Sequence, residues 1–389
     1  MECLKDYEIL LGTYEAFVIG YRLSEGTKKP KLETSVANHA HAGSVRCIAA
    51  ADKFLVTSGS DEIVKIFNLR NRTEHGTLNH NECTISAMTF YDKKNLITCA
   101  DDGKVCILRT GTWNVEKTLL SHTAGVTDVA VHPSGKLALT IGKDRKLVTW
   151  NLIKGRKAYV TNLHELADFV RWSPDGQKYL VGFYKRVDIY SVADASIDFS
   201  IKLNGRSNGV AFLDDNTLAL AGEMPQVEIY SMVTKELITK FDAHETRVRC
   251  LSFVEPSCLV TASNDGMVKV WKIKKNDDNT FEIQEDGSAN TKCRITSMQV
   301  HKVPKVITET PDVKPEDVEK LAEVALKRKK AVAFLEAKGE QVDKDDDTEE
   351  SGKKQKLVVE LDNEDEDKSK KGKKQKRKKK KKQSGVIGI

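Results

Sequence analysis

The stretch LTIGKDRKLVTWNL (139–152) carries a pattern that recurs in VTSGSDEIVKIFNL (56–69), ITCADDGKVCILRT (97–110) and VTASNDGMVKVWKI (260–273). Each copy has a β-rich run, a tight turn centred on an aspartate, and a second β-rich run that ends in an aromatic or bulky residue. The turn aspartates are Asp61, Asp102, Asp144 and Asp265, and the first three follow one another at intervals of 41 and 42 residues. A period near 41 residues with strand signals throughout is typical of a β-propeller in which each period forms one four-stranded blade.

Three weaker copies bring the number of repeats to seven. They are LGTYEAFVIGYRL (11–23), LVGFYKRVDIYSV (180–192) and LALAGEMPQVEIYSM (218–232). In these copies Glu15, Tyr184 and Met224 take the place of the turn aspartate. We therefore expect the aspartate-centred turn network to be absent from the blades of Tyr184 and Met224.

The N-terminal copy lacks an inner strand, because nothing before residue 7 could supply one. RITSMQV (294–300) resembles the inner runs VRCLSFV (248–254) and VTDVAVH (126–132). An open array would leave unpaired backbone groups at its edges, and closure of the ring removes them. The sequence thus predicts an all-β, seven-bladed propeller over residues 1–300, closed by its N- and C-terminal strands. A closed ring needs no second copy, so we expect a monomer.

Four histidines precede the turn aspartates by 20 to 22 residues. The pairs are His41 with Asp61, His80 with Asp102, His122 with Asp144, and His244 with Asp265. We expect each pair to be joined by a hydrogen bond from the entry loop to the turn, with Trp150 or Trp271 packed beneath in two blades. This arrangement resembles the structural network of WD40 repeats. Phe67 and Leu108 replace the tryptophan in the other two blades.

The repetition of the His–Asp pair argues against catalysis. A catalytic pair would be unique and would lie beside a nucleophile, whereas these pairs recur at four places. No phosphate-binding loop, paired-carboxylate site or metal-ligand cluster stands apart from the repeats. The sequence therefore predicts a protein that is not an enzyme, with no catalytic residue, cofactor or metal.

Charge is unevenly distributed along the chain, which is basic near its C-terminus and mildly acidic elsewhere. The net charge is +6, and the segment 368–382 alone holds twelve Lys or Arg, which leaves −6 for the rest of the chain. Eight scattered cysteines with no C-x-x-C pair indicate free thiols in a reducing compartment. No run approaches the roughly 20 apolar residues that a membrane span needs. The N-terminus, with its acidic residues, does not read as a secretory signal.

Residues 314–340 are predicted to form a helix that begins near Pro315 and ends at Gly339. Two interpretations remain open for it: a helix that is solvated or packed on the propeller, and a docking helix for a partner. The segment 341–389 is expected to be disordered, because its acidic blocks and Lys-rich run cannot bury enough apolar surface. Thr348 and Ser351 lie in an acidic setting that suits an acid-directed kinase.

The Lys-rich run KGKKQKRKKKKK (371–382) allows three interpretations: a merely solvated tail, an address read by a nuclear import receptor, and an electrostatic clamp for phosphates. We predict a nuclear and nucleolar address, combined with non-specific attraction to RNA. The run has no aromatic residues on which bases could stack, so it does not indicate sequence-specific RNA recognition. The targeting residues would be Lys371, Lys373, Lys374, Lys376, Arg377, Lys378, Lys379, Lys380, Lys381 and Lys382.

Beyond the repeats, several segments resemble the PAK-interacting WD-repeat family of nucleolar factors. They include VAVHPSGKLALTIGKDRKLVTWNLIKGRKAYVTNL (129–163), RNRTEHGTLNHNECTISAMTFYDKKNLITCADDGKVCIL (70–108), WSPDGQKY (172–179) and FDAHETRVR (241–249). The resemblance covers roughly residues 7–300. It implies a non-catalytic scaffold that joins pre-60S assembly factors and ribosomal proteins and supports ribosomal RNA maturation in the nucleolus.

The same resemblance implies a second function, since family members are linked to inhibition of p21-activated kinase through its regulatory region. An assembly scaffold and a kinase regulator are therefore both open at this point. An enzyme that works in the central funnel, as some propellers do, finds no support in the residues.

Overall fold

The computed structural model describes residues 4–24, 31–78, 83–194, 196–276 and 280–303. Within these residues the chain forms strands β1 to β28 and no helix. The chain divides after residue 307. The predicted helix at 314–340, the predicted disordered segment 341–389 and the Lys-rich run all lie outside the described residues.

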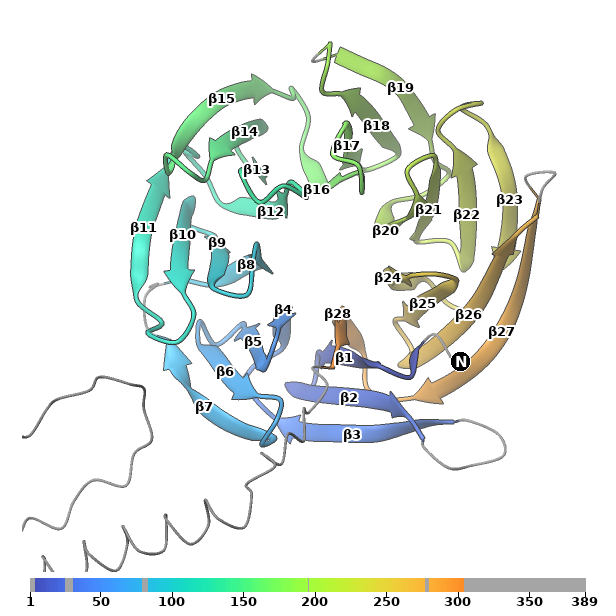
Figure 1. The fold of residues 1–389 in the computed structure, drawn as a ribbon, viewed down its shortest axis with the longest axis horizontal. Coiled ribbons are helices and arrows are strands. Elements are labelled where there is room, and N and C mark those ends of the chain that lie inside the picture. The colour runs from blue at the N-terminus through green and yellow to red at the C-terminus, as the bar shows by residue number, and fades with distance from the viewer. Residues whose placement is uncertain (1–3, 25–30, 79–82, 195, 277–279, 304–389) are drawn as a thin grey trace, which may run out of the picture. The chain divides into compact units, whose positions relative to one another are not determined.

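The strands form seven four-stranded antiparallel sheets that surround a central axis, as Figure 1 shows. Blade 1 holds β28 (Ile295–Lys302), β1 (Tyr7–Thr13), β2 (Phe17–Leu23) and β3 (Leu32–His39). Blade 2 holds β4 (Val45–Ala51), β5 (Phe54–Gly59), β6 (Val64–Asn68) and β7 (Thr73–Leu78), and blade 3 holds β8 (Ile85–Phe90), β9 (Asn95–Ala100), β10 (Lys104–Arg109) and β11 (Val115–Leu120). The predicted number of blades is confirmed.

The remaining four blades follow in chain order around the ring. Blade 4 holds β12 (Val126–Val131), β13 (Leu137–Gly142), β14 (Lys146–Asn151) and β15 (Arg156–Asn162), and blade 5 holds β16 (Ala167–Trp172), β17 (Lys178–Phe183), β18 (Arg186–Ser191) and β19 (Ser196–Lys202). Blade 6 holds β20 (Ser207–Asp214), β21 (Thr217–Gly222), β22 (Gln226–Ser231) and β23 (Leu237–Asp242), and blade 7 holds β24 (Val248–Val254), β25 (Cys258–Ser263), β26 (Met267–Lys275) and β27 (Phe281–Asn290).

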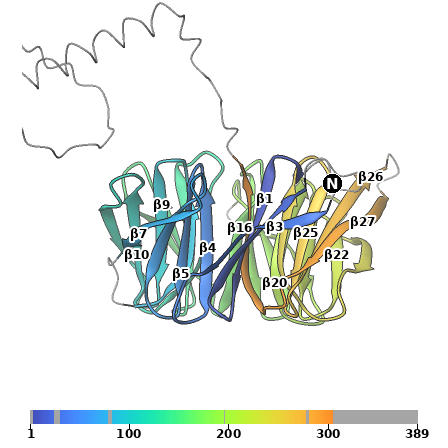
Figure 2. The ribbon, with the colours of Figure 1, turned by 90° about the horizontal axis from the view of Figure 1, so that it is seen from below.

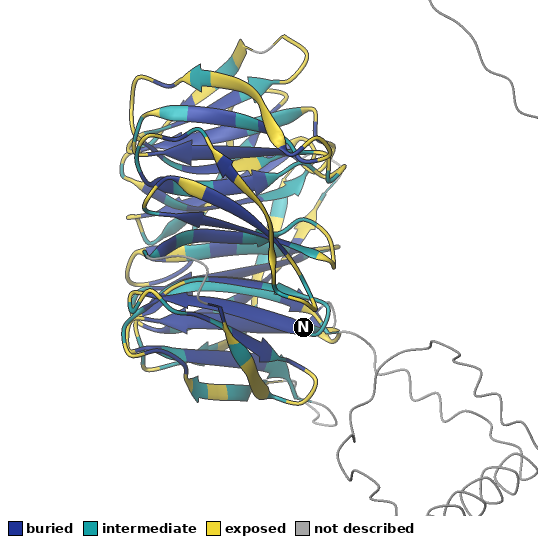
Figure 3. Cartoon of the chain, turned by 90° about the vertical axis from the view of Figure 1, so that its left-hand side faces the viewer, coloured by how far each residue is buried: buried dark blue, intermediate teal, exposed yellow. Residues whose placement is uncertain are grey.

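The second strand of each blade is the most deeply buried. Every residue of β5, β21 and β25 is buried, whereas the outer strand β15 is exposed along most of its length. Figure 3 shows buried residues along the strands of the blades and exposed residues gathered in the loops and along the outer strands. A strand with sheet faces packed on both sides must be apolar throughout, so it appears in the sequence as a continuous apolar run. An outer strand carries charged side chains that discourage pairing with other molecules. This gradient of burial explains why the second strands produced the clearest repeat signal.

The ring closes where the two ends of the propeller meet. Strand β28 pairs antiparallel with β1, from Tyr7 opposite Lys302 to Thr13 opposite Ile295. The Thr296 hydroxyl contacts the carbonyl oxygens of Gly12 and, in blade 2, of Val45, at 3.0 and 2.6 Å. The predicted closure by the C-terminal strand is therefore confirmed.

The ring has two faces and a central channel. The turns that carry Asp61, Asp144 and Asp265 lie on the same face as the loops that enter each blade, and we call this side the turn face. The inner strands line a channel of about 630 Å³. Figure 2 shows the ring edge-on, with the strands running between the two faces.

The cysteines differ in part from the sequence-based expectation. Cys47, Cys83, Cys99, Cys106, Cys250 and Cys293 are free thiols. Cys258 is fully buried and is disulfide-bonded, so the expectation of free thiols is wrong for this residue. Burial raises the pKa of the Cys47 thiol to about 12, which makes it a poor nucleophile.

In the described part of the chain, no helix is long and apolar enough to cross a membrane. No group of three or more His, Cys, Asp or Glu side chains in that part of the chain could hold a metal ion.

Candidate functional site

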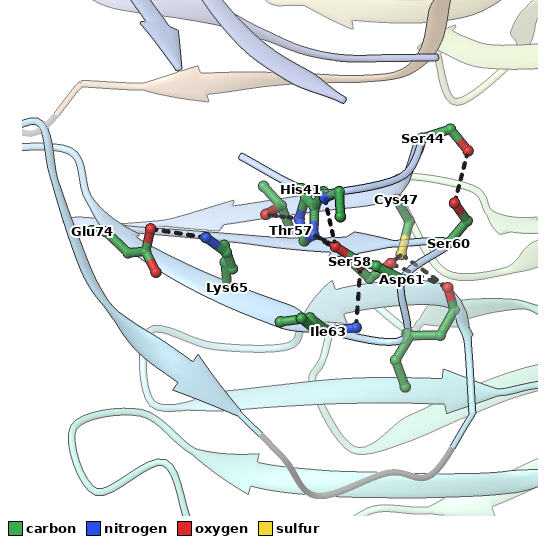
Figure 4. A network of polar contacts seen from close by, with 12 residues as sticks. His41, Ser44, Cys47, Thr57, Ser58, Ser60, Asp61, Ile63, Lys65 and Glu74 are labelled. Carbon is green, nitrogen blue, oxygen red and sulfur yellow. Dashed lines mark hydrogen bonds and ion pairs between the residues drawn. The ribbon is translucent and has the colours of Figure 1, made fainter. Parts of the chain in front are cut away.

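In blade 2 the predicted pair lies in contact at the turn face. His41 Nδ1 lies 3.1 Å from each carboxylate oxygen of Asp61, and His41 Nε2 lies 2.9 Å from Thr57 Oγ1 (Figure 4). Asp61 also accepts hydrogen bonds from the backbone N–H groups of Ala42 and Ile63, at 2.9 and 3.2 Å. One carboxylate therefore ties the entry loop to the turn.

The ionisation of this pair suits a structural role. Burial lowers the pKa of His41 and outweighs the attraction of Asp61, so the imidazole is neutral near pH 7. Burial alone would raise the pKa of Asp61, but hydrogen bonds from Ala42, Ile63 and His41 lower it. The result is a neutral ring held by an ionised carboxylate.

Blade 4 contains the fullest version of this network. His122 Nδ1 lies 3.0 Å from Asp144, and His122 Nε2 lies 2.8 Å from Thr140 Oγ1. The indole Nε1–H of Trp150 donates to the same hydroxyl at 2.8 Å. Asp144 accepts a further bond from the backbone N–H of Thr123, at 3.1 Å. The buried Trp150 ring thus anchors the third strand to the entry loop through Thr140.

Blade 7 departs from the prediction. His244 Nε2 lies 2.7 Å from Thr261 Oγ1, to which Trp271 Nε1–H also donates at 2.9 Å. The expected hydrogen bond between His244 and Asp265 is not formed. Asp265 instead accepts from the N–H of Met267 in its own turn, at 3.0 Å.

His244 is consequently left with an unpaired ring nitrogen. Its buried Nδ1 has no hydrogen-bond partner among the described residues. Burial, with a smaller contribution from the positive charge of Lys269, lowers the pKa of His244 to about 4. The ring is therefore neutral at physiological pH.

The pair predicted in blade 3 can be described only at one end. His80 lies outside the described residues. Asp102 accepts a hydrogen bond from the N–H of Lys104 at 2.9 Å and forms an ion pair with Lys104 Nζ at 2.8 Å. Leu108 and, in blade 2, Phe67 are buried at the tryptophan position, where neither offers a hydrogen-bond donor.

The sequence analysis missed the threonine that joins histidine to tryptophan. In all four strong repeats a threonine lies four residues before the turn aspartate, in TSGSD (57–61), TCADD (98–102), TIGKD (140–144) and TASND (261–265). Thr57, Thr98, Thr140 and Thr261 are fully buried. A buried threonine at a fixed position before a turn could have been recognised, because a buried hydroxyl needs a hydrogen-bond partner.

Replacement of these threonines should have graded effects on stability. Thr140→Val leaves the indole N–H of Trp150 without its acceptor and the buried Nε2 of His122 without its partner hydroxyl, and each orphaned group costs about 1–3 kcal/mol. We expect a loss of about 2–5 kcal/mol in the free energy of unfolding. Thr57→Val is the matched control and should cost about half as much, because only His41 uses that hydroxyl. Chemical denaturation of both variants measures the difference, and equal losses would contradict the proposed bonding.

Blades 6 and 1 tie their loops with a glutamate instead. In blade 6 the Glu223 carboxylate accepts from the N–H of Arg206 at 3.1 Å, beside the exposed Met224. In blade 1 Glu15 accepts from the N–H of Arg294 at 3.0 and 3.2 Å. A carboxylate therefore ties the loop to the turn in blade 6, where the sequence analysis expected no turn network.

The residues of the predicted address, Lys371 to Lys382, lie outside the described residues, and so do Thr348 and Ser351. Of the predicted network, the structure brings together His41 with Asp61 and His122 with Asp144. The indole N–H groups of Trp150 and Trp271 donate hydrogen bonds to threonine hydroxyls. The contacts connect loops to turns at successive points of one face, so their chemical effect is to hold that face in shape.

Both the repeats and most of the chain are similar to known proteins. The family model for the WD domain, G-beta repeat, matches residues 32–68, 113–151 and 235–272. The p21-activated protein kinase-interacting protein 1-like of Danio rerio is 38% identical, over 75% of this chain and 80% of the relative. The p21-activated protein kinase-interacting protein 1 of Homo sapiens is 32% identical over 75% and 76%. Protein MAK11 of Saccharomyces cerevisiae is 28% identical over 49% and 53%.

Proposed function

Because this chain belongs to the family of p21-activated protein kinase-interacting WD-repeat proteins, we propose that it is a non-catalytic nucleolar scaffold for assembly of the large ribosomal subunit. Its partners would be pre-60S assembly factors and ribosomal proteins. The nuclear address would be the Lys-rich run at 371–382, which would also attract RNA without sequence preference.

The observation that carries this proposal is that His–Asp pairs hold the entry loop to the turn in more than one blade. His41 and His122 each bond a turn carboxylate and a buried threonine, in different blades. Chemistry needs one site with a nucleophile beside the base, whereas a platform needs many loops held in fixed positions. The braced turn face therefore favours binding over catalysis.

A second candidate is regulation of p21-activated kinase. The observation that favours it is the printed name of the vertebrate relatives, which describes an interaction with that kinase. In that case the propeller would bind the regulatory region of the kinase, in the cytoplasm as well as in the nucleus.

Affinity purification from cells distinguishes the two proposals. We expect the tagged full-length chain to recover proteins of the large-subunit precursor particles. Ribonuclease treatment should release those proteins that are held through RNA. Recovery of the kinase without ribosomal proteins would overturn the scaffold proposal and support the regulator.

Neutralisation of the basic run tests the address. When the Lys and Arg residues of 371–382 are changed to Gln, we expect the protein to leave the nucleolus and unprocessed ribosomal RNA to accumulate several-fold. The matched control changes the acidic residues of 343–350 to Asn and Gln, and it should leave imaging and RNA blots unchanged. Unaltered localisation and processing in the Lys-run variant would contradict the proposed function.

A further inference from the structure

Four exposed arginines gather on the turn face over blades 7, 1 and 2. We call them the arginine arc: Arg247, Arg249, Arg294 and Arg46. Arg247 lies in the loop that enters blade 7, and Arg294 lies in the loop that enters blade 1. Arg249 and Arg46 each occupy the second position of an inner strand, where the register shifts against the second strand of the blade.

Two arginines of the arc converge on one neutral oxygen. Arg247 Nη2 and Arg294 Nε donate to Asn264 Oδ1, at 3.4 and 2.9 Å. The Arg294 guanidinium also lies over the ring of Tyr14, 5.3 Å from its centre. Because the two positive charges repel each other and their shared acceptor is neutral, an anion that binds between them would be favourable. Each guanidinium also has further N–H groups that can donate to such an anion.

A third arginine of the arc, Arg249, also lacks an acidic partner among the described residues. Arg249 Nε donates to the backbone oxygen of Thr296 at 3.2 Å, at the channel wall. Among the described residues, none of the four arc arginines forms an ion pair. Two carboxylates of this face accept backbone hydrogen bonds rather than pairing with a guanidinium: Glu15 accepts from the N–H of Arg294, and Asp265 accepts from the N–H of Met267.

Two other arginines, which line the channel, are neutralised. Arg171 pairs with Asp128, and Arg206 pairs with Asp168. The arc is therefore a group of four exposed arginines over blades 7, 1 and 2 that form no ion pair among the described residues. Such a short charged arc suits an extended chain segment with a few carboxylates rather than a long duplex.

An apolar trio lies on the same face, next to the arc. Leu166, Tyr184 and Met224 belong to the loops and turns of blades 5 and 6 and are 56%, 57% and 47% exposed. Met224 also borders a small pocket lined in part by Leu203 and Leu220. Burial of exposed apolar side chains against apolar groups is favourable, and a protein segment offers such groups whereas a phosphate backbone does not.

We propose that the turn face binds an extended segment of another protein, whose Asp or Glu side chains contact the arginine arc and whose apolar side chains cover Leu166, Tyr184 and Met224. Arginine is suited to this role because its planar guanidinium can hold a carboxylate through two hydrogen bonds. This inference rests on the proposed role as a binding scaffold, but it does not depend on where in the cell that scaffold works.

A selection from a displayed library of random linear peptides tests the proposal on the full chain. The library is first depleted on a synthetic peptide of residues 368–382, which removes sequences that bind the basic run. We expect the wild-type protein to enrich peptides that combine Asp or Glu with apolar residues. Benzophenone groups placed in the enriched peptides should cross-link to Tyr14, Asn264 or Tyr184.

The deciding variant is Arg247→Ala with Arg294→Ala. Hydrogen bonds to charged groups are strong enough that their loss should lower recovery of the enriched peptides at least about tenfold. Arg70→Ala with Arg156→Ala is the matched control, because it removes the same charge from exposed positions away from the turn face. This control should bind as the wild type does, and thermal unfolding should show all three proteins to be folded.

Three results would overturn the inference: enrichment of neutral peptides or of none, equal recovery by the Arg247/Arg294 variant, or loss in that variant of binding to single-stranded RNA but not to peptides. The last result would assign the arc to nucleic acid. None of these results affects the purification of ribosomal precursors, so failure here is distinct from failure of the proposed function.

Discussion

A chain that ends after Arg294 should fail to fold, whereas one that ends after Val303 should unfold at the same temperature as the full protein. The two truncations differ only by strand β28 and one residue. The shorter chain loses the seven residue pairs between β28 and β1, and the buried Ile295. Each backbone hydrogen bond contributes about 1 kcal/mol net, so the loss is at least about 5 kcal/mol. That approaches the whole stability of a typical protein, about 5–15 kcal/mol.

Thermal unfolding and gel filtration check this result, since an open blade exposes the edge of β1 and should aggregate. A synthetic peptide of residues 294–303, added during refolding, should restore some soluble protein to the shorter chain. If the chain ending after Arg294 unfolded cooperatively at the full-length temperature, β28 would not close the ring in solution.

Replacement of Glu8 by Gln should destabilise the propeller by about 3 kcal/mol. Glu8 is fully buried in β1, and its carboxylate lies 3.0 Å from Arg22 Nη2 and 2.6 Å from Arg72 Nη1. The Ser35 hydroxyl also donates to it. Because Arg72 belongs to blade 2, this carboxylate joins the closing blade to its neighbour. Both arginines are partly exposed, so water reduces the cost of leaving them unpaired.

The effect of Glu8 should depend on pH in a defined direction. Burial alone would raise the pKa of Glu8, but hydrogen bonds from Arg72 and Ser35 and the charges of Arg72 and Arg22 lower it below 4.5. A lowered pKa adds stability above the unfolded-state value, and that stability is lost as the pH falls through the folded-state pKa. The wild-type advantage over Glu8→Gln should therefore be full at pH 7 and shrink below about pH 4.

The matched control is Glu74→Gln, which breaks a surface ion pair with Lys65 of 3.1 Å. Surface pairs contribute about 0–1 kcal/mol, so this variant should unfold almost as the wild type does. Urea titrations at pH 7 and pH 3.5 measure both variants. A Glu8→Gln loss no larger than that of Glu74→Gln would refute the role of Glu8 as a link between blades.

The repeated part of the fold was readable from residues that are close in sequence. Turn aspartates such as Asp144 and the apolar run before each of them lie within one hairpin, so local patterning determines both. The match of RITSMQV (294–300) to other inner strands predicted closure, because the missing strand had to resemble its equivalents. The histidines were found in the same way, since loop and turn keep a constant spacing within a blade.

By itself, then, the sequence determined a seven-bladed ring, its closing strand and the position of the braced turns. Only the tertiary structure showed that His244 lacks its aspartate, that Thr140 joins His122 to Trp150, and that Glu8 is paired with Arg72 from the next blade. It also showed that Arg247 and Arg294 meet at Asn264. These contacts join residues from different strands or blades, and a side chain's partner depends on distances of a few tenths of an ångström, which no periodic pattern encodes.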